Sequence, residues 1–156
     1  DSGAHKVSVG SACAKDPGLV TRIAARVGGE AVVASVDVRW AGNGWRVHTH
    51  GGERGTGREA IEWCRELDGL GVGEILLTSM DRDGTTAGYD TDLIRYVTEV
   101  VSCPVVANGG AGRIADFVSA CRNGASGVLA GSLFHFRHVT IQEVKDGLAV
   151  EGFAVT

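Results

Sequence analysis

Two apolar runs of the sequence lead directly into acidic residues. Asp37 ends the run VVASVD, and the tetrad DRDG (81–84) follows the run EILLTS. Such runs indicate buried strands, and parallel α/β folds bind ligands at the carboxyl ends of their strands. Partial burial there raises a carboxyl pKa toward useful acid–base values. Asp37 is therefore a candidate acid or base, because no helix follows that it could cap. Asp83 has a simpler alternative as part of a charged turn.

Two glycine-rich stretches follow later apolar runs. The first is NGGAG (108–112), and the second is AGS (130–132), whose Ser132 opens a short helix. Both present backbone N–H groups, and a phosphate site built from the last two strand–helix loops and a short helix recurs in barrels. Ordinary turn glycines are the alternative. The spacing G-x-G-x-x-G is absent, so a dinucleotide fingerprint is not supported.

The elements that must position these groups repeat as strand, loop and helix. We predict strands over 5–9, 31–38, 74–79, 103–108 and 127–131, and helices over about 17–27, 56–70, 91–101, 114–121 and 140–151. GSACAK (10–15) is expected to be a loop, and a hairpin insertion is expected at about 39–50. Five consecutive strand–helix units predict an α/β fold with a parallel sheet covered by helices.

Composition narrows the class of protein. The chain has 156 residues, 44% of them apolar, with 24 glycines and 2 prolines, which favours one globular domain over residues 1–156. The net charge of −4 gives no basic footprint for nucleic acid. No apolar run approaches the roughly 20 residues of a membrane span, so a cytoplasmic protein is expected. The spacings of cysteines and histidines fit no metal site, and no cofactor is predicted.

Charged residues also mark the opposite ends of the strands. Lys6 and Glu74 lie where two predicted strands begin. From position alone they are solvated or paired rim charges.

Specific motifs connect the chain to a known family. GEILLTSMDRDGTTAGYD, VVANGGAG, LAGSLFHFR, GAHKVSVGSA and VVASVDVR resemble the cyclase subunit of imidazole glycerol phosphate synthase, of the histidine pathway. The resemblance covers essentially the whole chain and implies a (β/α)8 TIM barrel, here from its fourth strand to its eighth helix. It makes the chain a partial barrel of five units, and the missing initiator methionine leads us to expect a fragment.

The resemblance also implies a reaction and its site. In this family, ammonia attacks a phosphoribulosyl-formimino aminoimidazole carboxamide ribotide, giving imidazole glycerol phosphate and the aminoimidazole carboxamide ribotide. Asp37 matches the general acid of the fifth strand, and its partner aspartate would precede residue 1. Thr78 matches a polar residue beside the reacting centre. One substrate phosphate is assigned to Asp83, Gly84, Gly109, Gly110, Gly131 and Ser132.

The resemblance assigns the remaining groups to the second phosphate and to a partner. Ser8 and Ser11 match part of the second phosphate site. Lys6 and Glu74 match charged residues around the ammonia entrance, which faces a glutamine amidotransferase subunit.

Two alternatives remain open at this point. A non-catalytic partial barrel that binds phosphate or a partner would leave two open sheet edges, which favour self-association. The related sugar-isomerising barrel of the same pathway shares the two phosphates, but TSMDRDGT and SLFHF argue against it.

Overall fold

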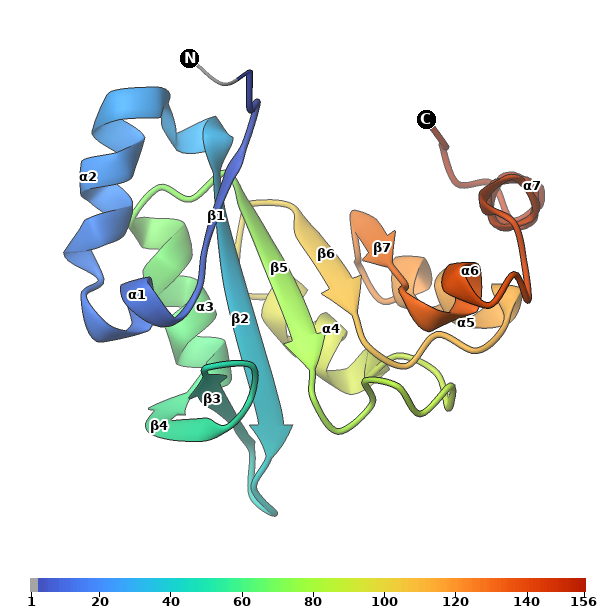
Figure 1. Ribbon diagram of the computed structural model, residues 1–156, viewed down its shortest axis with the longest axis horizontal. Coiled ribbons are helices and arrows are strands. Elements are labelled where there is room, and N and C mark those ends of the chain that lie inside the picture. The colour runs from blue at the N-terminus through green and yellow to red at the C-terminus, as the bar shows by residue number, and fades with distance from the viewer. Residues whose placement is uncertain (1–2) are drawn as a thin grey trace.

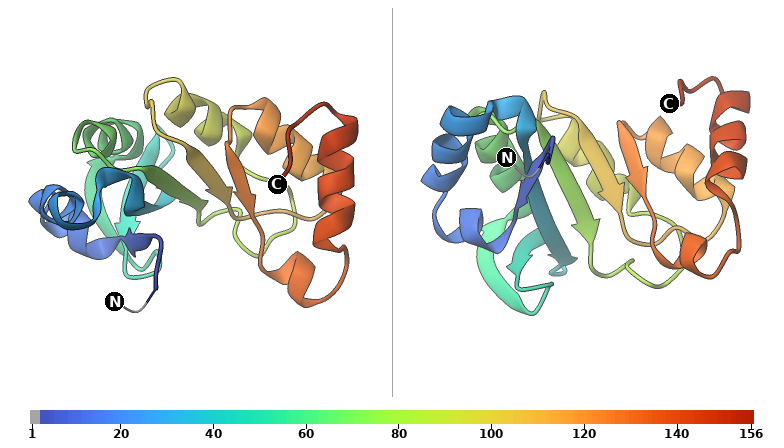
Figure 2. Two further views of the ribbon diagram at one scale, coloured as in Figure 1. Left: turned by 90° about the horizontal axis from the view of Figure 1, so that it is seen from above. Right: turned by 45° about the horizontal axis from the view of Figure 1, so that its top comes forward.

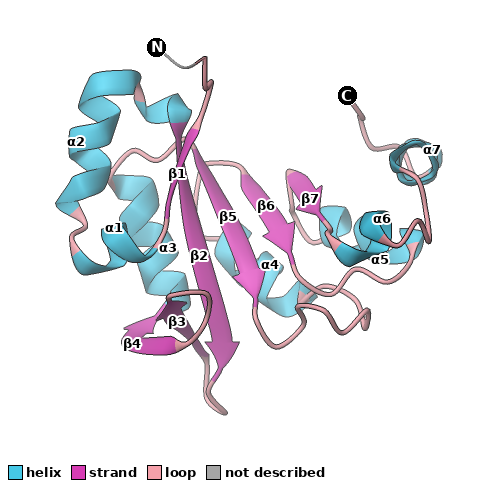
Figure 3. Cartoon of the chain, in the orientation of Figure 1, coloured by secondary structure: helices cyan, strands magenta, loops and turns pink. Residues whose placement is uncertain are grey.

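The computed structural model describes residues 3–156 of the chain (Figure 1), so residues 1 and 2 of the predicted domain lie outside the described residues. The strands are β1 (Val7–Val9), β2 (Val32–Trp40), β3 (Trp45–Thr49), β4 (Arg54–Glu59), β5 (Glu74–Ser79), β6 (Val105–Asn108) and β7 (Gly127–Leu129). The α-helices are α1 (Ser11–Lys15), α2 (Gly18–Val27), α3 (Ala60–Gly69), α4 (Thr91–Thr98), α5 (Ile114–Arg122), α6 (Ser132–His135) and α7 (Ile141–Val150). Figure 3 shows how strands and helices alternate along the chain.

All strands belong to one sheet that is parallel in its main body. β1, β2, β5, β6 and β7 pair in that order, and each neighbouring pair is parallel. β3 and β4 form an antiparallel extension on the far half of β2. The predicted α/β fold with five parallel strands is therefore confirmed. The sheet is curved and stays open between β1 and β7 (Figure 2).

The two faces of the sheet differ in what covers them. Val36 and Val38 of β2 are fully buried on the face that carries the helices, whereas the alternating Ser35 and Asp37 lie on the other face, half-buried. Helices α3, α4 and α5 lie behind the sheet in Figure 1, and none of the described helices crosses its inner face. Two apolar clusters form the core, one around β2, β5 and α3 and one around α5 and α7.

Local sequence signals explain where most helices begin. The Asp90 carboxylate accepts from the backbone N–H of Leu93 at 3.1 Å, which caps α4. Thr140 and Glu143 form a reciprocal capping box at the start of α7. These caps fix the positions of the helices that follow the ligand-side loops.

The predicted helix over 56–70 is wrong in its first four residues. Residues 54–59 form β4, and α3 starts at Ala60, with Glu59 accepting from the N–H of Glu62. Gly57 has φ +75°, which no helix contains, and the Thr56 hydroxyl donates to the Val47 carbonyl at 2.9 Å. Pairing with β3 therefore decides the structure of this stretch, rather than its own periodicity.

Three further boundaries differ from the predictions. GSACAK is not a loop, because Ser11–Lys15 form α1. The first strand begins at Val7 rather than at residue 5. Asp37 does not end its strand, because β2 continues to Trp40 by pairing with β3. The expected hairpin is present, and its second strand pairs with β4 as well.

Candidate functional site

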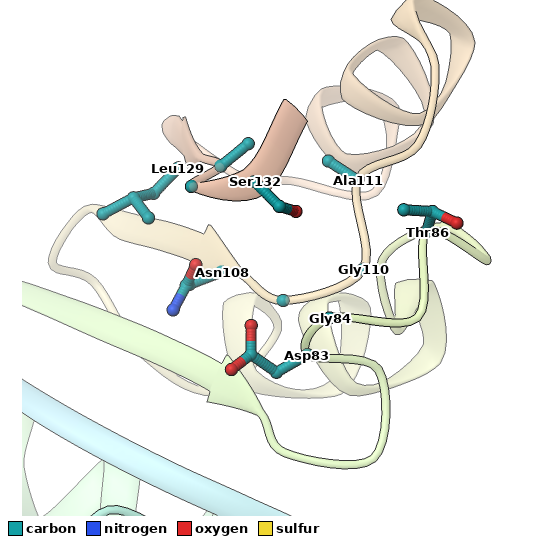
Figure 4. A pocket seen from close by; sticks show the side chains of 11 residues that line it. Asp83, Gly84, Thr86, Asn108, Gly110, Ala111, Leu129 and Ser132 are labelled. Atoms are coloured by element: carbon teal, nitrogen blue, oxygen red, sulfur yellow. The ribbon is translucent and has the colours of Figure 1, made fainter. Parts of the chain in front are cut away.

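A pocket of about 150 Å³ lies at the carboxyl ends of three neighbouring strands, β5, β6 and β7. Its walls come from the loops after these strands and from the first residue of α6 (Figure 4). The residues that were predicted for the first substrate phosphate all line this pocket. The lining residues are Asp83, Gly84, Thr86, Asn108, Gly109, Gly110, Ala111, Leu129, Ala130, Gly131 and Ser132. The topology thus brings together segments almost 50 residues apart in the sequence.

Backbone N–H groups are the donors that this pocket offers. Within residues 3–156, no protein acceptor pairs with the backbone N–H of Gly84, Gly110, Gly131 or Ser132. None of the lining residues is Lys or Arg. In Figure 4 the Ser132 hydroxyl points toward the loop that carries Gly110. Unpaired N–H groups that converge on a small hollow bind anions, so the pocket fits a phosphate group.

The glycines of the pocket differ in whether the backbone and packing require glycine. A Cβ on Gly110 would come within 2.3 Å of the Gly88 carbonyl oxygen, and one on Gly109 within 2.6 Å of the Ser79 oxygen. Both residues also have positive φ, so packing and backbone demand glycine there. Gly131 differs, since its φ is −98° and a Cβ would meet nothing within 4 Å. Neither the backbone nor packing therefore requires glycine at position 131. Its missing side chain only leaves open space in the pocket.

Tyr89 joins the two walls of the pocket from behind. Its hydroxyl donates to the Leu129 carbonyl at 2.9 Å, and its ring packs edge-on against Phe117. Burial raises the pKa of the Tyr89 hydroxyl far above its usual value, so Tyr89 stays a neutral donor.

Asp37 lies on the same rim, in one row with polar side chains of the next strands. Asp37 is in register with Thr78 of β5, and Thr78 is in register with Asn108 of β6. Side chains in register on neighbouring parallel strands lie on the same face. The Asn108 amide donates to the Thr78 hydroxyl at 3.2 Å. This row connects Asp37 to the pocket, which Asn108 also lines.

The surroundings of Asp37 favour its protonated form. Burial raises the pKa of the carboxyl, and the negative charge of Asp83 raises it further, while the Thr78 hydroxyl and His48 act in the opposite direction. The net shift is upward. An upward shift brings the pKa of a carboxyl closer to the range in which it can act as a general acid.

The predicted residues of the second phosphate site lie apart from this pocket. The hydroxyls of Ser8 and Ser35 are 2.7 Å apart on the inner face of the sheet. Ser11 opens α1, and its hydroxyl accepts from the backbone N–H of His50 at 2.9 Å. These serines are thus engaged with other parts of the chain, and the hollow that Ser11 lines is not lined by Ser8.

Lys6 and Glu74 meet at the opposite end of the strands. Their side chains form an ion pair of 2.7 Å across β2, with Lys6 about half exposed. Position alone allowed either solvated or paired charges, and the structure has the pair.

Three residues on the rim or the inner face were missed as site residues in the sequence. Thr86 lines the pocket, Ser35 pairs with Ser8, and His48 stands opposite Asp37 in the β2–β3 ladder. The alternation of Ser35 and Asp37 in a strand with period two is a signal that could have found Ser35. Thr86 and His48 depend on loop and hairpin packing, for which the sequence carries no local signal.

The described residues contain neither a metal-binding cluster nor a helix that could span a membrane. No group of three or more His, Cys, Asp or Glu side chains in residues 3–156 is placed to hold a metal ion. Within the same range, every helix is too short or too polar to cross a bilayer.

The fold is that of a barrel-type α/β protein, with a pocket at its strand ends. Residues 1–140 match the family described as Histidine biosynthesis protein, and the chain belongs to that family. This finding confirms the resemblance seen in the sequence.

Individual relatives agree with the family. The chain is 47% identical to imidazole glycerol phosphate synthase subunit HisF of Pyrobaculum aerophilum, over 99% of this chain and 61% of that protein. The proteins of the same name from Hyphomonas neptunium and Mycobacteroides abscessus are 48% and 49% identical, over 99% of this chain and 62% and 63% of their own lengths. The chain thus spans about three fifths of the curated relatives that it matches.

Proposed function

We propose that this chain carries the general acid and one phosphate site of the cyclase of imidazole glycerol phosphate synthase. The substrate is then the doubly phosphorylated formimino ribotide of histidine biosynthesis, and ammonia is the second reactant. The proposal combines the relatives' names with the geometry of the rim. Catalysis of this kind is a lyase-type cyclisation.

The observation that carries this proposal is the continuity between Asp37 and the phosphate pocket. Asp37, Thr78 and Asn108 lie side by side on one face of the sheet. Asn108 also lines the pocket, and the pocket contains the unpaired N–H groups. An anionic group held in the pocket leaves the rest of the ligand extending along this row toward Asp37. Holding a reactant next to an acid in fixed geometry is itself a large part of catalysis.

Each group then has a defined task in the reaction. The N–H groups of Gly84, Gly110, Gly131 and Ser132 hold the phosphate, and the Asp37 carboxyl, whose pKa is raised by burial, donates a proton to the leaving group. The Thr78 hydroxyl, held by Asn108, positions the reacting centre. The resemblance assigns the matching base to an aspartate outside this chain.

The opposite end of the strands suits the delivery of ammonia. We infer that Lys6 and Glu74 face a glutamine amidotransferase subunit there, as the resemblance implies. Their ion pair closes part of the inner face, and a small neutral molecule has to pass beside it.

A second candidate function is phosphate or partner binding without catalysis. The open edges of β1 and β7 and the uncovered inner face support it. A single general acid without its base also loses most of the rate. We therefore expect this chain alone to bind the substrate weakly and not to turn it over.

The first experiment is an ammonia-dependent assay of imidazole glycerol phosphate formation. The chain is assayed alone and together with a second polypeptide that supplies the remaining strands. Product only in the mixture supports the cyclase. Product from this chain alone contradicts the assigned need for a second aspartate, and an inactive but well-formed mixture contradicts the cyclase itself. Replacement of Asp37 by Asn in the active mixture should abolish turnover while substrate binding stays nearly unchanged.

The phosphate pocket is tested by substitution at Gly131. Gly131→Asp adds a negative charge to the open space of the pocket without a clash, so substrate binding measured by calorimetry should weaken at least tenfold. Gly69→Asp is the matched control, because Gly69 ends α3 and also has open space around it. Equal binding by both variants would show that the pocket does not hold the phosphate.

A further inference from the structure

The segment between β5 and α4, residues 81–90, forms one wall of the proposed phosphate pocket. We call it the phosphate loop, because Asp83, Gly84 and Thr86 of this segment line the pocket (Figure 4). Gly84 and Thr86 have positive φ angles of 74° and 57°, so the segment is an irregular turn. An irregular loop has no ladder of backbone hydrogen bonds, so contacts at its two ends decide where its N–H groups lie.

The first end of the phosphate loop is tied to β2 through Asp81. The last pair between β2 and β5 is Val38 with Ser79, whereas β2 continues to Trp40. The Trp40 backbone N–H therefore has no residue of β5 beside it, and the Asp81 carboxylate accepts from it at 2.7 Å. Such a charge-assisted hydrogen bond is of the stronger kind. The ion pair of Asp81 with Arg39 is longer, 3.4 Å, and exposed, so it adds little.

The second end of the phosphate loop is tied to β3 through Asp90. One oxygen of Asp90 accepts from the Leu93 N–H and caps α4, and the other accepts from the indole N–H of Trp45 at 3.0 Å. The Trp45 ring is fixed on two sides, because its centroid lies 4.8 Å from that of Trp40 and 5.8 Å from that of Tyr96. These ring contacts keep the indole N–H directed at Asp90.

Packing does not replace these two contacts. A hollow of about 500 Å³ lies between the hairpin and the outer side of the phosphate loop. Trp40 and Trp45 line it from the hairpin, and Arg82, Thr85 and Ala87 line it from the loop. Side chains do not interlock across such a hollow, so packing leaves the distance between hairpin and loop open.

The inner side of the phosphate loop rests on the glycine-rich loop after β6. The Gly88 N–H donates to the Gly110 carbonyl at 2.8 Å, and a Cβ on Gly112 would come within 2.2 Å of the Thr86 carbonyl oxygen. The phosphate loop is thus held between this loop and the hairpin. Without its contacts to the hairpin it is free to shift into the hollow, which would draw the Gly84 N–H back from the pocket.

We propose that Trp45, Asp81 and Asp90 are positioning residues of the phosphate site, which clamp the phosphate loop to the hairpin of β2 and β3. None of the three lines the pocket itself. The clamp keeps the binding position of the loop dominant, so a phosphate group binds without first having to order it. The inference rests on the proposed function through the phosphate pocket, and it extends that site to the antiparallel hairpin.

The first test compares two neighbouring tryptophans in this chain. Trp45→Phe removes the N–H that Asp90 accepts and keeps an aromatic ring in place. Trp40→Phe is the matched control, because Trp40 contacts Asp81 through its backbone N–H, which the substitution retains.

Binding of inorganic phosphate to each protein is followed by NMR, through the amide signals of Gly84, Gly110 and Ser132. We expect the dissociation constant to rise about threefold in Trp45→Phe and to stay within about 1.5-fold of the wild type in Trp40→Phe. Equal dissociation constants in the two variants, whether raised or not, overturn the proposal.

Asp81 gives a larger effect and a rescue. The dissociation constant should rise at least tenfold in Asp81→Ala, and Asp81→Asn, which keeps an acceptor for the Trp40 N–H, should restore most of the affinity. Exchange of the Gly88 amide hydrogen with solvent should accelerate at least tenfold in Asp81→Ala, whereas the Ile75 amide, which donates to Pro104 at the other end of β5, should keep its rate. Equal acceleration of both amides would show a general loss of stability and would overturn the proposal.

The two readouts separate the failure of this inference from the failure of the proposed function. A wild-type chain whose amide signals do not respond to phosphate refutes the phosphate pocket, and exchange at Gly88 then decides whether the clamp holds the loop. Phosphate binding that is equal in the wild type, Trp45→Phe and Asp81→Ala refutes the clamp and leaves the pocket intact.

Discussion

The two ends of the parallel strands differ in whether their polar groups are paired within the protein. At the amino ends, Lys6 pairs with Glu74, and Asp68 accepts from the backbone N–H groups of Ser102 and Cys103 and from the Ser102 hydroxyl. At the carboxyl ends, the N–H groups of Gly84, Gly110, Gly131 and Ser132 have no acceptor among residues 3–156, and Asp37 is held in a setting that disfavours its charge. The comparison indicates that one end contributes stability and that the other keeps its interactions for a ligand.

The largest expected effect contrasts two glycines of the same pocket. Gly110→Ala places a Cβ 2.3 Å from the Gly88 carbonyl at a φ of +108°, so we expect a loss of about 3 kcal/mol in the free energy of unfolding. Gly131→Ala should change it by less than about 0.5 kcal/mol. Urea unfolding of the three proteins measures both. Similar losses in the two variants would mean that Gly131 is also required by packing.

The next effect concerns the amino end. Asp68→Ala removes an acceptor of several hydrogen bonds between α3 and the start of β6, and we expect a loss of about 2 kcal/mol. Although burial acts to raise it, these hydrogen bonds hold the pKa of Asp68 below its usual range. The contribution is therefore present above the unfolded pKa of about 3.9 and is lost as the pH falls through the folded value. Glu53→Ala, at an exposed loop position, is the control.

Replacing Asp37 should change the free energy of unfolding in the opposite direction from replacing Asp68. Burial raises the pKa of Asp37, so its ionised form destabilises the folded chain, and Asp37→Asn should be more stable than the wild type at neutral pH. The gain should shrink as the pH falls through the raised folded pKa toward the unfolded value, and it should vanish below the unfolded pKa, where both side chains are neutral. Thermal unfolding across this pH range tests it. A variant that is less stable at pH 7 would place Asp37 among the groups that support the fold.

The smallest effect is expected for the ion pair. Lys6 is 49% and Glu74 is 21% exposed, so a double-mutant cycle with Lys6→Met and Glu74→Gln should give a coupling of about 0.5 kcal/mol that declines with added salt. A coupling above about 2 kcal/mol would show that this end is more rigid than its exposure implies.

The parallel sheet and its loops were predictable from the sequence to a greater extent than the strand pairing around β3 and β4. Strand order, the parallel sheet and the pocket glycines were predictable, because apolar runs and glycine-rich loops are local signals and parallel topology aligns their ends. The helix predicted from Thr56 was wrong because pairing with β3 overrode periodicity. The hairpin itself was predicted, but the extension of β2 past Asp37 and the register that places His48 opposite it depend on strand pairing, which the turn signal alone does not specify.

The edge of β2 is shared by two different partners, and the change of partner occurs beside Asp37. Residues 32–34 pair with β1, whereas residues 37–40 pair with the hairpin. The environment of Asp37 is thus built partly from the parallel strands and partly from the antiparallel hairpin. Evolution or design can alter the hairpin without disturbing the parallel ladder, so acidity at this position is adjustable separately from the scaffold that carries it.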